Sequence, residues 1–342
     1  MKALVKSAPG PGHVDLAEVP EPSPGDHQVK IEVDACGICG TDLHVYNDTF
    51  RNYPPVILGH EFAGSIVETG KEVDTFAVGE RVTVLGASTV TCGECPYCRR
   101  GEFMFCPQRR GMGHGVNGAF ARYAVARTDQ LFRLPESLPT EEGAMVEPFA
   151  AAVHAVCEIG DPRLGDVALV SGPGPIGLLC VKLLAAQGVK TLVAGVAADR
   201  LRLTTARDFG AARVIDVDSE DLGTAIREET DGFGVHITFE CAGAANSAAN
   251  CLASLRSLGR HVQVGHFGHE IQLPYDHIAF KQLRLAGSVG YTEASWHRSL
   301  AILEAGGVRL TDMISHRLPL SDWNQGFDLC RRGEALKVLL DP

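Results

Sequence analysis

A glycine-spaced turn near the middle of the chain is the feature that most constrains the fold. Gly172, Gly174 and Gly177 follow an apolar run at residues 167–171 and open an apolar helical pattern at 176–187. The spacing G-x-G-x-x-G allows a tight turn and a close backbone approach to a pyrophosphate, whose charge the helix N-terminus favours. Between a strand and a helix the motif predicts a dinucleotide site, with a plain strand–helix turn as the alternative.

The segments around this turn alternate between strand and helix patterns. Strands are predicted at residues 167–171, 191–196, 214–217, 237–241, 261–264 and 283–288, and helices at 146–159, 176–187 and 201–209. This alternation is typical of a doubly wound parallel sheet with right-handed crossovers, the Rossmann arrangement. The residues expected to contact the dinucleotide phosphates are Gly172, Gly174, Pro175, Ile176 and Gly177.

The position expected to bind the adenosine ribose has no acidic residue. A carboxylate usually lies about 20 residues after the glycine turn. Here the chain reads Gly195-Val196-Ala197, and Arg200 and Arg202 follow closely. Because a carboxylate would repel a 2′-phosphate and an arginine would bind one, the sequence allows NADP without excluding NAD. Val196, Arg200 and Arg202 are the candidate contacts on this side.

The first part of the chain is rich in strand patterns instead. Residues 28–36 alternate with a period of two, which predicts a half-buried strand, and shorter runs lie at 56–58, 64–68, 81–85 and 120–126. After residue 290 two helices (296–305 and 322–332) and a strand (337–340) are expected. We therefore expect a β-barrel-type domain over 1–153, completed by 290–342, and a dinucleotide-binding domain over 154–289.

Four cysteines crowd into a lobe at about residues 90–107 of the first domain. Cys92, Cys95, Cys98 and Cys106 have the spacing C-x₂-C-x₂-C-x₇-C. Four thiolates that converge on one point suit a closed, structural zinc site. An iron–sulfur cluster also uses four cysteines, but this lobe interrupts a β-domain and has no partner redox site. Four unrelated thiols in a loop are the remaining alternative.

A second set of metal-binding residue types is dispersed along the chain. Cys39 follows the first strong strand, His60 and Glu61 come some twenty residues later, and Glu147 stands near the domain change. One Cys, one His and one or two carboxylates can hold zinc with a position left open for substrate. Taken singly, a residue such as His60 is more often a satisfied surface or core histidine, and one such as Glu147 is usually a solvated charge. Cys36 could form a redox pair with Cys39, but its place on the strand favours a packed thiol.

Composition and charge exclude several classes of partner. The chain has 342 residues, 42 acidic and 31 basic, with a formal net charge of −11. This acidity argues against nucleic acid and against an anionic membrane surface. No apolar run approaches the roughly 20 residues of a membrane helix, and the first residues lack a signal-peptide core. The 11 cysteines, an odd number, argue against a disulfide framework, so we expect a cytoplasmic protein.

Together the motifs resemble the zinc-dependent medium-chain alcohol dehydrogenase family. The resemblance is carried, in the expected order, by Cys39-Gly-Thr-Asp-Leu-His44, Gly59-His60-Glu61, the four-cysteine lobe, Glu147-Pro148 and Gly172-Pro-Gly-Pro-Ile-Gly177. It covers essentially the whole chain. Within the family, Glu147-Pro148 resembles the sorbitol (L-iditol) and L-threonine dehydrogenase branch.

The resemblance implies a GroES-like catalytic domain joined to a Rossmann domain, with two zinc ions per chain. It implies a catalytic zinc near Cys39, His60 and Glu61, with Glu147 as a ligand directly or through water. It implies a structural zinc in the cysteine lobe. Thr41 and His44 would form a proton relay, although capping of a short helix is the simpler interpretation of these two residues from the sequence alone. Members of this branch are commonly homotetramers, so a tetramer or dimer is expected.

The implied reaction is the transfer of hydride between a small secondary alcohol and NAD or NADP. After Glu147-Pro148-Phe149 the chain reads Ala150-Ala151-Ala152, where threonine dehydrogenases tend to carry Gly-Asn, so a polyol is the preferred substrate. A threonine-type amino-alcohol dehydrogenase remains open. A zinc-free reductase of the same fold would lack Cys39, His60 and the lobe. A non-enzymatic dinucleotide-binding protein would tolerate loss of the relay, which is intact.

Overall fold

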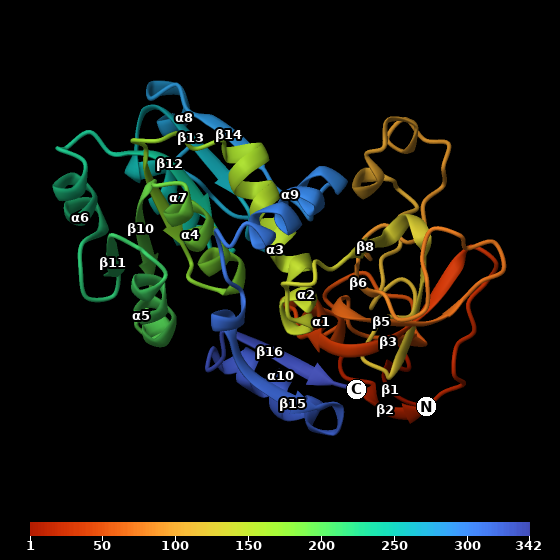
Figure 1. Ribbon diagram of the computed structural model, residues 1–342. Coiled ribbons are helices and arrows are strands. Elements are labelled where there is room, and N and C mark those ends of the chain that lie inside the picture. The colour runs from red at the N-terminus through yellow and green to blue at the C-terminus, as the bar shows by residue number, and fades with distance from the viewer. The chain divides into compact units, whose positions relative to one another are not determined.

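The computed structural model describes residues 1–342 and divides the chain into two compact units. Unit 1 comprises Met1–Glu147 and Thr292–Pro342, and unit 2 comprises Pro148–Tyr291. Helix α3 (Val146–Val153) carries the chain from the first unit into the second (Figure 1). None of the helices combines the length and the apolar character that a membrane crossing needs.

Unit 2 is built on six parallel strands in the order β11-β10-β9-β12-β13-β14. The chain runs outward from β9 to β11, returns to the centre, and runs outward again from β12 to β14. Right-handed crossovers therefore place α4 and α5 on one face of the sheet and α7 and α8 on the other. The strands are β9 (Val167–Ser171), β10 (Lys190–Gly195), β11 (Arg213–Asp216), β12 (Val235–Glu240), β13 (Leu255–Gln263) and β14 (Arg284–Gly287).

The helices of unit 2 cover both faces of the central strand β9. Ala168, Leu169 and Val170 in β9 are each fully buried, as expected for a central parallel strand with helices on both sides. The strand order reverses between β9 and β12, and ligands of such sheets bind outside the carboxyl ends at this point. The helices are α4 (Pro175–Ala186), α5 (Arg200–Asp208), α6 (Leu222–Glu229), α7 (Ala245–Ser254) and α8 (Asp276–Phe280), with a π-helical segment at His154–Gly160.

Unit 1 contains two largely antiparallel sheets. A three-stranded sheet has the order β2-β1-β4, and a seven-stranded sheet has the order β15-β16-β3-β5-β6-β8, with β7 also pairing with β3. The strands are β1 (Lys2–Lys6), β2 (Val14–Glu18), β3 (Gln28–Gly37), β4 (Val56–Ile57), β5 (Glu61–Thr69), β6 (Arg81–Val84), β7 (Tyr123–Arg127), β8 (Leu131–Arg133), β15 (Ile314–Pro319) and β16 (Lys337–Asp341). The helices are α1 (Gly40–Tyr46), α2 (Thr140–Ala144), α9 (Glu293–Glu304) and α10 (Trp323–Arg332).

Strand β3 lies at the centre of the larger sheet and is buried on one face and partly buried on the other. Val29, Ile31 and Val33 pack into the core as the alternation predicted, but Lys30 and Cys36 on the opposite face are also buried. The prediction of a half-buried strand is nevertheless confirmed, because Glu32 is half-buried and Asp34 is exposed on that second face. The strand is hydrogen-bonded to β5, β7 and β16.

Several predicted elements differ from the observed ones at their ends. The strand expected at 120–126 is observed as Tyr123–Arg127, and the helix expected at 146–159 ends at Val153 and continues as the π-helical segment. Strands β1, β2, β8 and β15 were not predicted. In β15 the exposed and half-buried positions alternate along Ile314–Pro319, no position is buried, and polar side chains occupy three of the six, so its apolar signal is weak.

Candidate metal centres and dinucleotide site

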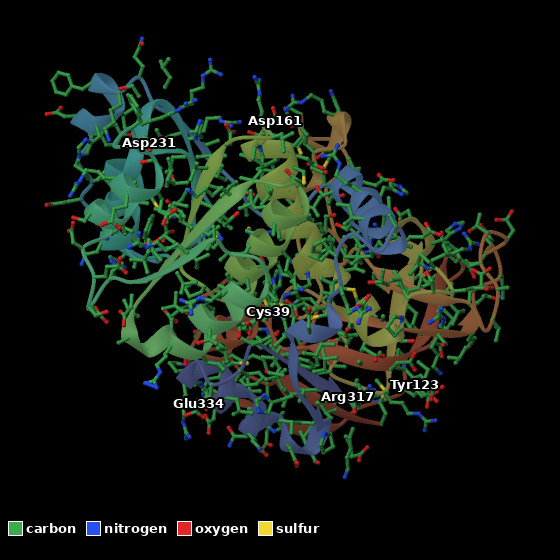
Figure 2. The ribbon with its side chains drawn as sticks, turned by 60° about the vertical axis from the view of Figure 1, so that its left-hand side comes forward. Cys39, Tyr123, Asp161, Asp231, Arg317 and Glu334 are labelled. Carbon is green, nitrogen blue, oxygen red and sulfur yellow. The ribbon has the colours of Figure 1, made fainter.

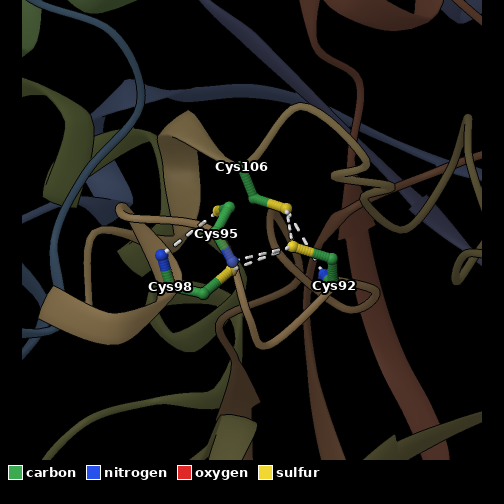
Figure 3. Close-up of side chains that lie close together, drawn as sticks. All are labelled: Cys92, Cys95, Cys98 and Cys106. Atoms are coloured by element: carbon green, nitrogen blue, oxygen red, sulfur yellow. Dashed lines mark hydrogen bonds between the residues drawn. The ribbon is translucent and has the colours of Figure 1, made fainter.

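The four-cysteine lobe brings its sulfur atoms to one point (Figure 3). All four ligand atoms lie within 4.8 Å of one another, and Cys92 Sγ is 3.9 Å from Cys98 Sγ and 3.7 Å from Cys106 Sγ. Tetrahedral zinc with bonds of about 2.3 Å requires sulfur–sulfur separations of about 3.8 Å. The observed spacing therefore fits a closed zinc site with no open position.

Backbone N–H groups of the lobe point at the sulfurs and stabilise negative charge on them. The N–H groups of Cys95 and Cys98 donate to Cys92 Sγ and Cys95 Sγ, each at 3.4 Å. Hydrogen bonds from the backbone N–H groups of Glu94 and Cys95 lower the pKa of Cys92 to about 7. Since thiolates are the species that bind zinc, this backbone arrangement prepares the lobe for a metal.

A second group of ligand atoms comes from three predicted residues. Cys39, labelled in Figure 2, precedes α1, and His60 and Glu61 stand at the start of β5. Their ligand atoms lie within 4.8 Å of one another. Glu147, half-buried in the first turn of α3, is not part of this group. The structure thus brings together three of the four residues predicted to hold the catalytic zinc.

The second group lies in surroundings that favour a cation. Burial acts to lower the pKa of His60, but the Asp42 carboxylate and the Cys39 thiolate outweigh it and raise this pKa well above its usual value. His60 Nδ1 is buried and has no hydrogen-bond partner. A metal ion bound here would compensate the negative charge of Asp42 and Cys39, which a proton on His60 compensates in its absence. The donor set therefore fits zinc.

Asp42 organises this group, although sequence reasoning did not single it out. Its side chain is 1% exposed, and its Oδ2 accepts the Cys39 N–H at 2.9 Å. Its Oδ1 accepts the Gly59 N–H at 3.4 Å and lies 3.6 Å from His60 Nδ1. Carboxylates beside metal-binding histidines orient the ring in this way. The only sequence signal was the position of Asp42 inside the motif that begins at Cys39.

Glu61 is held by a buried lysine from the far end of the chain. Lys337 in β16 is 3% exposed and donates from Nζ to Glu61 Oε2 at 2.6 Å and to the Ile38 carbonyl at 3.1 Å. Burial acts to lower the pKa of Lys337, but the Glu61 carboxylate outweighs it and holds this pKa above its usual value. The ion pair fixes the rotamer of Glu61. No sequence pattern connects these two positions.

The two predicted relay residues both belong to α1 but are not hydrogen-bonded to each other. Thr41 is half-buried, and Cys39 Sγ lies 3.6 Å from its Oγ1. His44 is exposed in the last turn of the helix, and its Nδ1 lies 3.0 Å from Thr49 Oγ1. Thr41 is thus adjacent to the metal group. Cys36, by contrast, is fully buried, and burial raises the pKa of its thiol well above the usual value.

The glycine turn of unit 2 has the geometry that a pyrophosphate requires. Gly172 has φ +97°, and a Cβ there would lie 2.5 Å from the Ala242 nitrogen, so only glycine fits. A Cβ on Gly174, the N-cap of α4, would meet nothing within 4 Å. Pro175 and Ile176 begin the helix, and Gly177 packs against the Gly172 carbonyl. The open space at Gly174 is where phosphates can approach the backbone.

The loop after β10 differs from that of a chain with a ribose-binding acid. Val196 is 41% exposed, and its N–H donates to Asp199 Oδ2 at 3.2 Å. Asp199 also lies 3.7 Å from Arg202, while Asp218 accepts the Ala197 N–H at 2.9 Å. Arg200 is exposed and its guanidinium has no carboxylate partner. Asp199 and Asp218 therefore stabilise this turn by accepting backbone N–H groups. The guanidinium of Arg200 remains available to a ligand.

Comparison with known proteins assigns the class. Residues 25–136 match the alcohol dehydrogenase GroES-like domain, and residues 175–305 match the zinc-binding dehydrogenase domain. A sorbitol dehydrogenase of Halalkalibacterium halodurans is 39% identical, with 100% of this chain and 99% of that protein covered. A D-arabitol-phosphate dehydrogenase of Enterococcus avium is 34% identical over 100% of this chain and 97% of its own length.

Two further comparisons extend this result. An L-threonine 3-dehydrogenase of an Anaeromyxobacter species is 34% identical, with 100% and 99% coverage. The crystal structure of a zinc-binding dehydrogenase from Sinorhizobium meliloti bound to NADP has a TM-score of 0.89 and 31% identity, covering 100% of this chain and 99% of that one. These matches define an oxidoreductase with a GroES-like domain and a zinc-binding dehydrogenase domain.

The chain belongs to the zinc-dependent medium-chain alcohol dehydrogenase family. This confirms the family and the fold class predicted from the motifs, and also the prediction of an enzyme. The predicted reaction class is confirmed with it: hydride transfer between a secondary alcohol and a nicotinamide dinucleotide, with zinc as the metal of the family.

Proposed function

We propose that this chain is a polyol dehydrogenase with its active centre at Cys39, His60 and Glu61. The convergence of these three ligand atoms beside the buried carboxylate of Asp42 carries the proposal. When bound there, zinc supplies a Lewis acid that lowers the pKa of a coordinated hydroxyl. Glu147 would complete the ligand set directly or through water. The lobe cysteines would hold a second, structural zinc.

The residues of α1 would handle the substrate proton. Thr41 is adjacent to Cys39 and can accept a hydrogen bond from the substrate hydroxyl. His44 is exposed and can exchange a proton with solvent. We propose that Thr41 takes up the proton and that His44 releases it to solvent. Loss of the proton prepares the alcohol carbon to give up hydride.

The dinucleotide would bind along the carboxyl ends of β9 and β10. The backbone from Gly172 to Gly177, including Pro175 and Ile176, would hold the pyrophosphate. Val196 would pack against the adenosine ribose. Arg200 would contact a 2′-phosphate, helped by Arg202, so NADP is favoured where both dinucleotides are present.

Substrate oxidation by the purified enzyme tests this function directly. Initial rates would be measured with sorbitol, other polyols, simple secondary alcohols and L-threonine, each with NAD and NADP. We expect turnover of a polyol and two zinc ions per chain. Cys39→Ser should abolish turnover and leave the lobe zinc in place. Turnover of L-threonine alone, which the threonine dehydrogenase relatives make the second candidate, would refute the polyol assignment.

The protein would act in the cytoplasm as a homo-oligomer, a tetramer or a dimer. Strand β14 is an edge strand whose four residues are all exposed, and Leu285 and Val289 are 40% and 41% exposed. An exposed apolar edge is suited to pairing with a second copy. Leu285→Lys should shift the mass measured by light scattering toward a smaller species. Leu201→Lys, at a residue 52% exposed on α5, should not.

A further inference from the structure

An arginine-rich surface of unit 1 borders the loop of residues 111–118, and this loop packs against Gly59, the residue before His60. We call it the arginine rim and define it as Arg51, Arg109 and Arg110. The Arg110 guanidinium lies 4.2 Å from the ring centroid of Tyr53, and the Arg51 guanidinium lies 5.9 Å from the same centroid. Arg51 also donates from Nη2 to the Arg109 carbonyl. Two segments, 51–53 and 109–110, thus gather cationic groups around one aromatic ring.

The two exposed guanidinium groups of the rim have no carboxylate partner. Neither Arg51 nor Arg110 lies within ion-pair distance of an Asp or Glu, although the chain has 42 acidic residues. Elsewhere the chain pairs its arginines closely, as Arg213 does with three glutamates and Arg260 with Asp166 at 2.6 Å. Two unpaired cations that share one ring repel each other, and an anionic ligand would relieve that repulsion.

A buried histidine links the rim to the metal group. His114 is 7% exposed, its carbonyl accepts the Tyr53 N–H at 2.8 Å, and its ring meets Phe50 edge-on at 5.1 Å. Burial first, and then the positive charges of His60, Arg109 and Arg51, lower the pKa of His114 to about 4. The loop that carries His114 also packs beside the metal group, because a Cβ on Gly113 would lie 3.0 Å from the Gly59 carbonyl oxygen, next to His60. Its Nδ1 is buried without a hydrogen-bond partner.

From this arrangement we propose that the substrate alcohol carries an oxyanion, which Arg51 and Arg110 bind while its hydroxyl faces the metal group. The neutral imidazole of His114 would hydrogen-bond an intermediate hydroxyl of the substrate through Nδ1. Phosphate monoesters and carboxylates share the required chemistry, because a guanidinium presents parallel N–H donors to either. The inference rests on the proposed function and narrows its substrate class to anionic polyols.

Matched substrates and matched variants test the inference. The enzyme would be assayed with sorbitol, sorbitol 6-phosphate and gluconate, and binding of each would be followed in parallel by calorimetry. We expect kcat/KM for an anionic substrate to exceed that for sorbitol, and KM for it to rise with ionic strength. The substrate with the higher kcat/KM, sorbitol 6-phosphate or gluconate, then shows whether the bound anion is a phosphate or a carboxylate. Arg51→Gln and Arg110→Gln should each lower kcat/KM for it by about 10-fold, mainly through KM.

The control is another arginine that stacks on an aromatic ring. Arg133 lies 4.2 Å from the Phe76 ring centroid but is paired with Glu80 at 3.1 Å, so Arg133→Gln should change neither KM nor its salt dependence. KM for the dinucleotide should stay constant in all three variants. Equal losses for sorbitol and its phosphate in the rim variants, or a changed oligomeric mass, would overturn the inference.

Failure of the inference and failure of the proposed function give different results. If no alcohol is oxidised by enzyme that holds two zinc ions, the proposed function fails. The calorimetry then still reports on the rim, because binding of sorbitol 6-phosphate or gluconate needs no turnover. If sorbitol is oxidised and neither anion binds more tightly than sorbitol, the inference alone is refuted.

Discussion

Replacing Lys337 by Met should destabilise unit 1 strongly, because the change leaves a carboxylate buried without its partner. Glu61 is 1% exposed, and Lys337 Nζ at 2.6 Å is the cation that compensates its charge. Methionine nearly keeps the side-chain volume, so little cavity forms. Removing one member of a buried ion pair costs about 3–5 kcal/mol. We expect a loss of this size in protein stripped of zinc, where no metal can take over the compensation.

The two tryptophans of the chain make the measurement specific. Trp296 and Trp323 both belong to unit 1, so their fluorescence reports the unfolding of that unit. Urea titrations with linear extrapolation give its free energy of unfolding. The zinc-loaded protein should lose less stability than the stripped one if Glu61 also ligates the metal. Zinc content, measured before each titration, identifies the two states.

Two controls separate the buried charge from other effects of the substitution. Glu61→Gln combined with Lys337→Met removes both charges and should recover part of the loss. Arg317, which pairs with Asp341 at 2.8 Å with both side chains exposed, offers a surface pair in the same sheet (Figure 2). Arg317→Met should cost less than about 1 kcal/mol. A loss below 1 kcal/mol for Lys337→Met in stripped protein would refute the reasoning.

Three further predictions concern pH, the lobe and the glycine turn. Because the folded pKa of His114 is about 4, below its unfolded value of roughly 6.5, the unfolded state binds the extra proton as pH falls. His114 should therefore contribute a loss of about 2 kcal/mol of stability from pH 7.5 to 5, which His114→Gln should remove, whereas His27→Gln, at a side chain 70% exposed, should not. Cys98→Ser should leave one zinc per chain and lower the melting temperature, measured by metal analysis and calorimetry; an unchanged zinc count would contradict the lobe assignment. Gly174→Ala should fold normally and raise KM for the dinucleotide, because its Cβ would occupy the open space where phosphates approach. Gly172→Ala should lower stability as well. If Gly174→Ala has the same KM for the dinucleotide as the unmodified enzyme, the phosphates do not contact the backbone at Gly174.

Features that depend on short spacings were predictable from the sequence. The four lobe cysteines fall within fifteen residues, and the glycine turn spans six, so turn geometry alone brings the groups together. Cys39, His60 and Glu61 were predicted from a resemblance rather than from spacing. Once β3 and β5 pair, with Gly37 opposite Glu61, the three residues meet at one end of the sheet.

Features that depend on long-range pairing were not predictable. Lys337 meets Glu61 across 276 residues, and only the register of β16 on β3 brings them together. Arg51 and Arg110 gather around Tyr53 because two loops pack on each other, and neither loop carries a pattern that reports the other. Glu147 is the opposite case. The Glu147-Pro148 motif predicted it as a zinc ligand, but it lies outside the group formed by Cys39, His60 and Glu61.

The divided course of unit 1 has a consequence for how the chain folds during synthesis. Unit 2 is one continuous segment and can fold as soon as it leaves the ribosome, whereas β16 must find β3 across a separation of about 300 residues. Until it does, Glu61 lacks its cation and the central sheet has an open edge. Early folding of unit 2 draws together the two parts of unit 1 that flank it, which lowers the entropy cost of that closure. Zinc supplied before synthesis ends would reach a metal group whose Glu61 is not yet paired with Lys337.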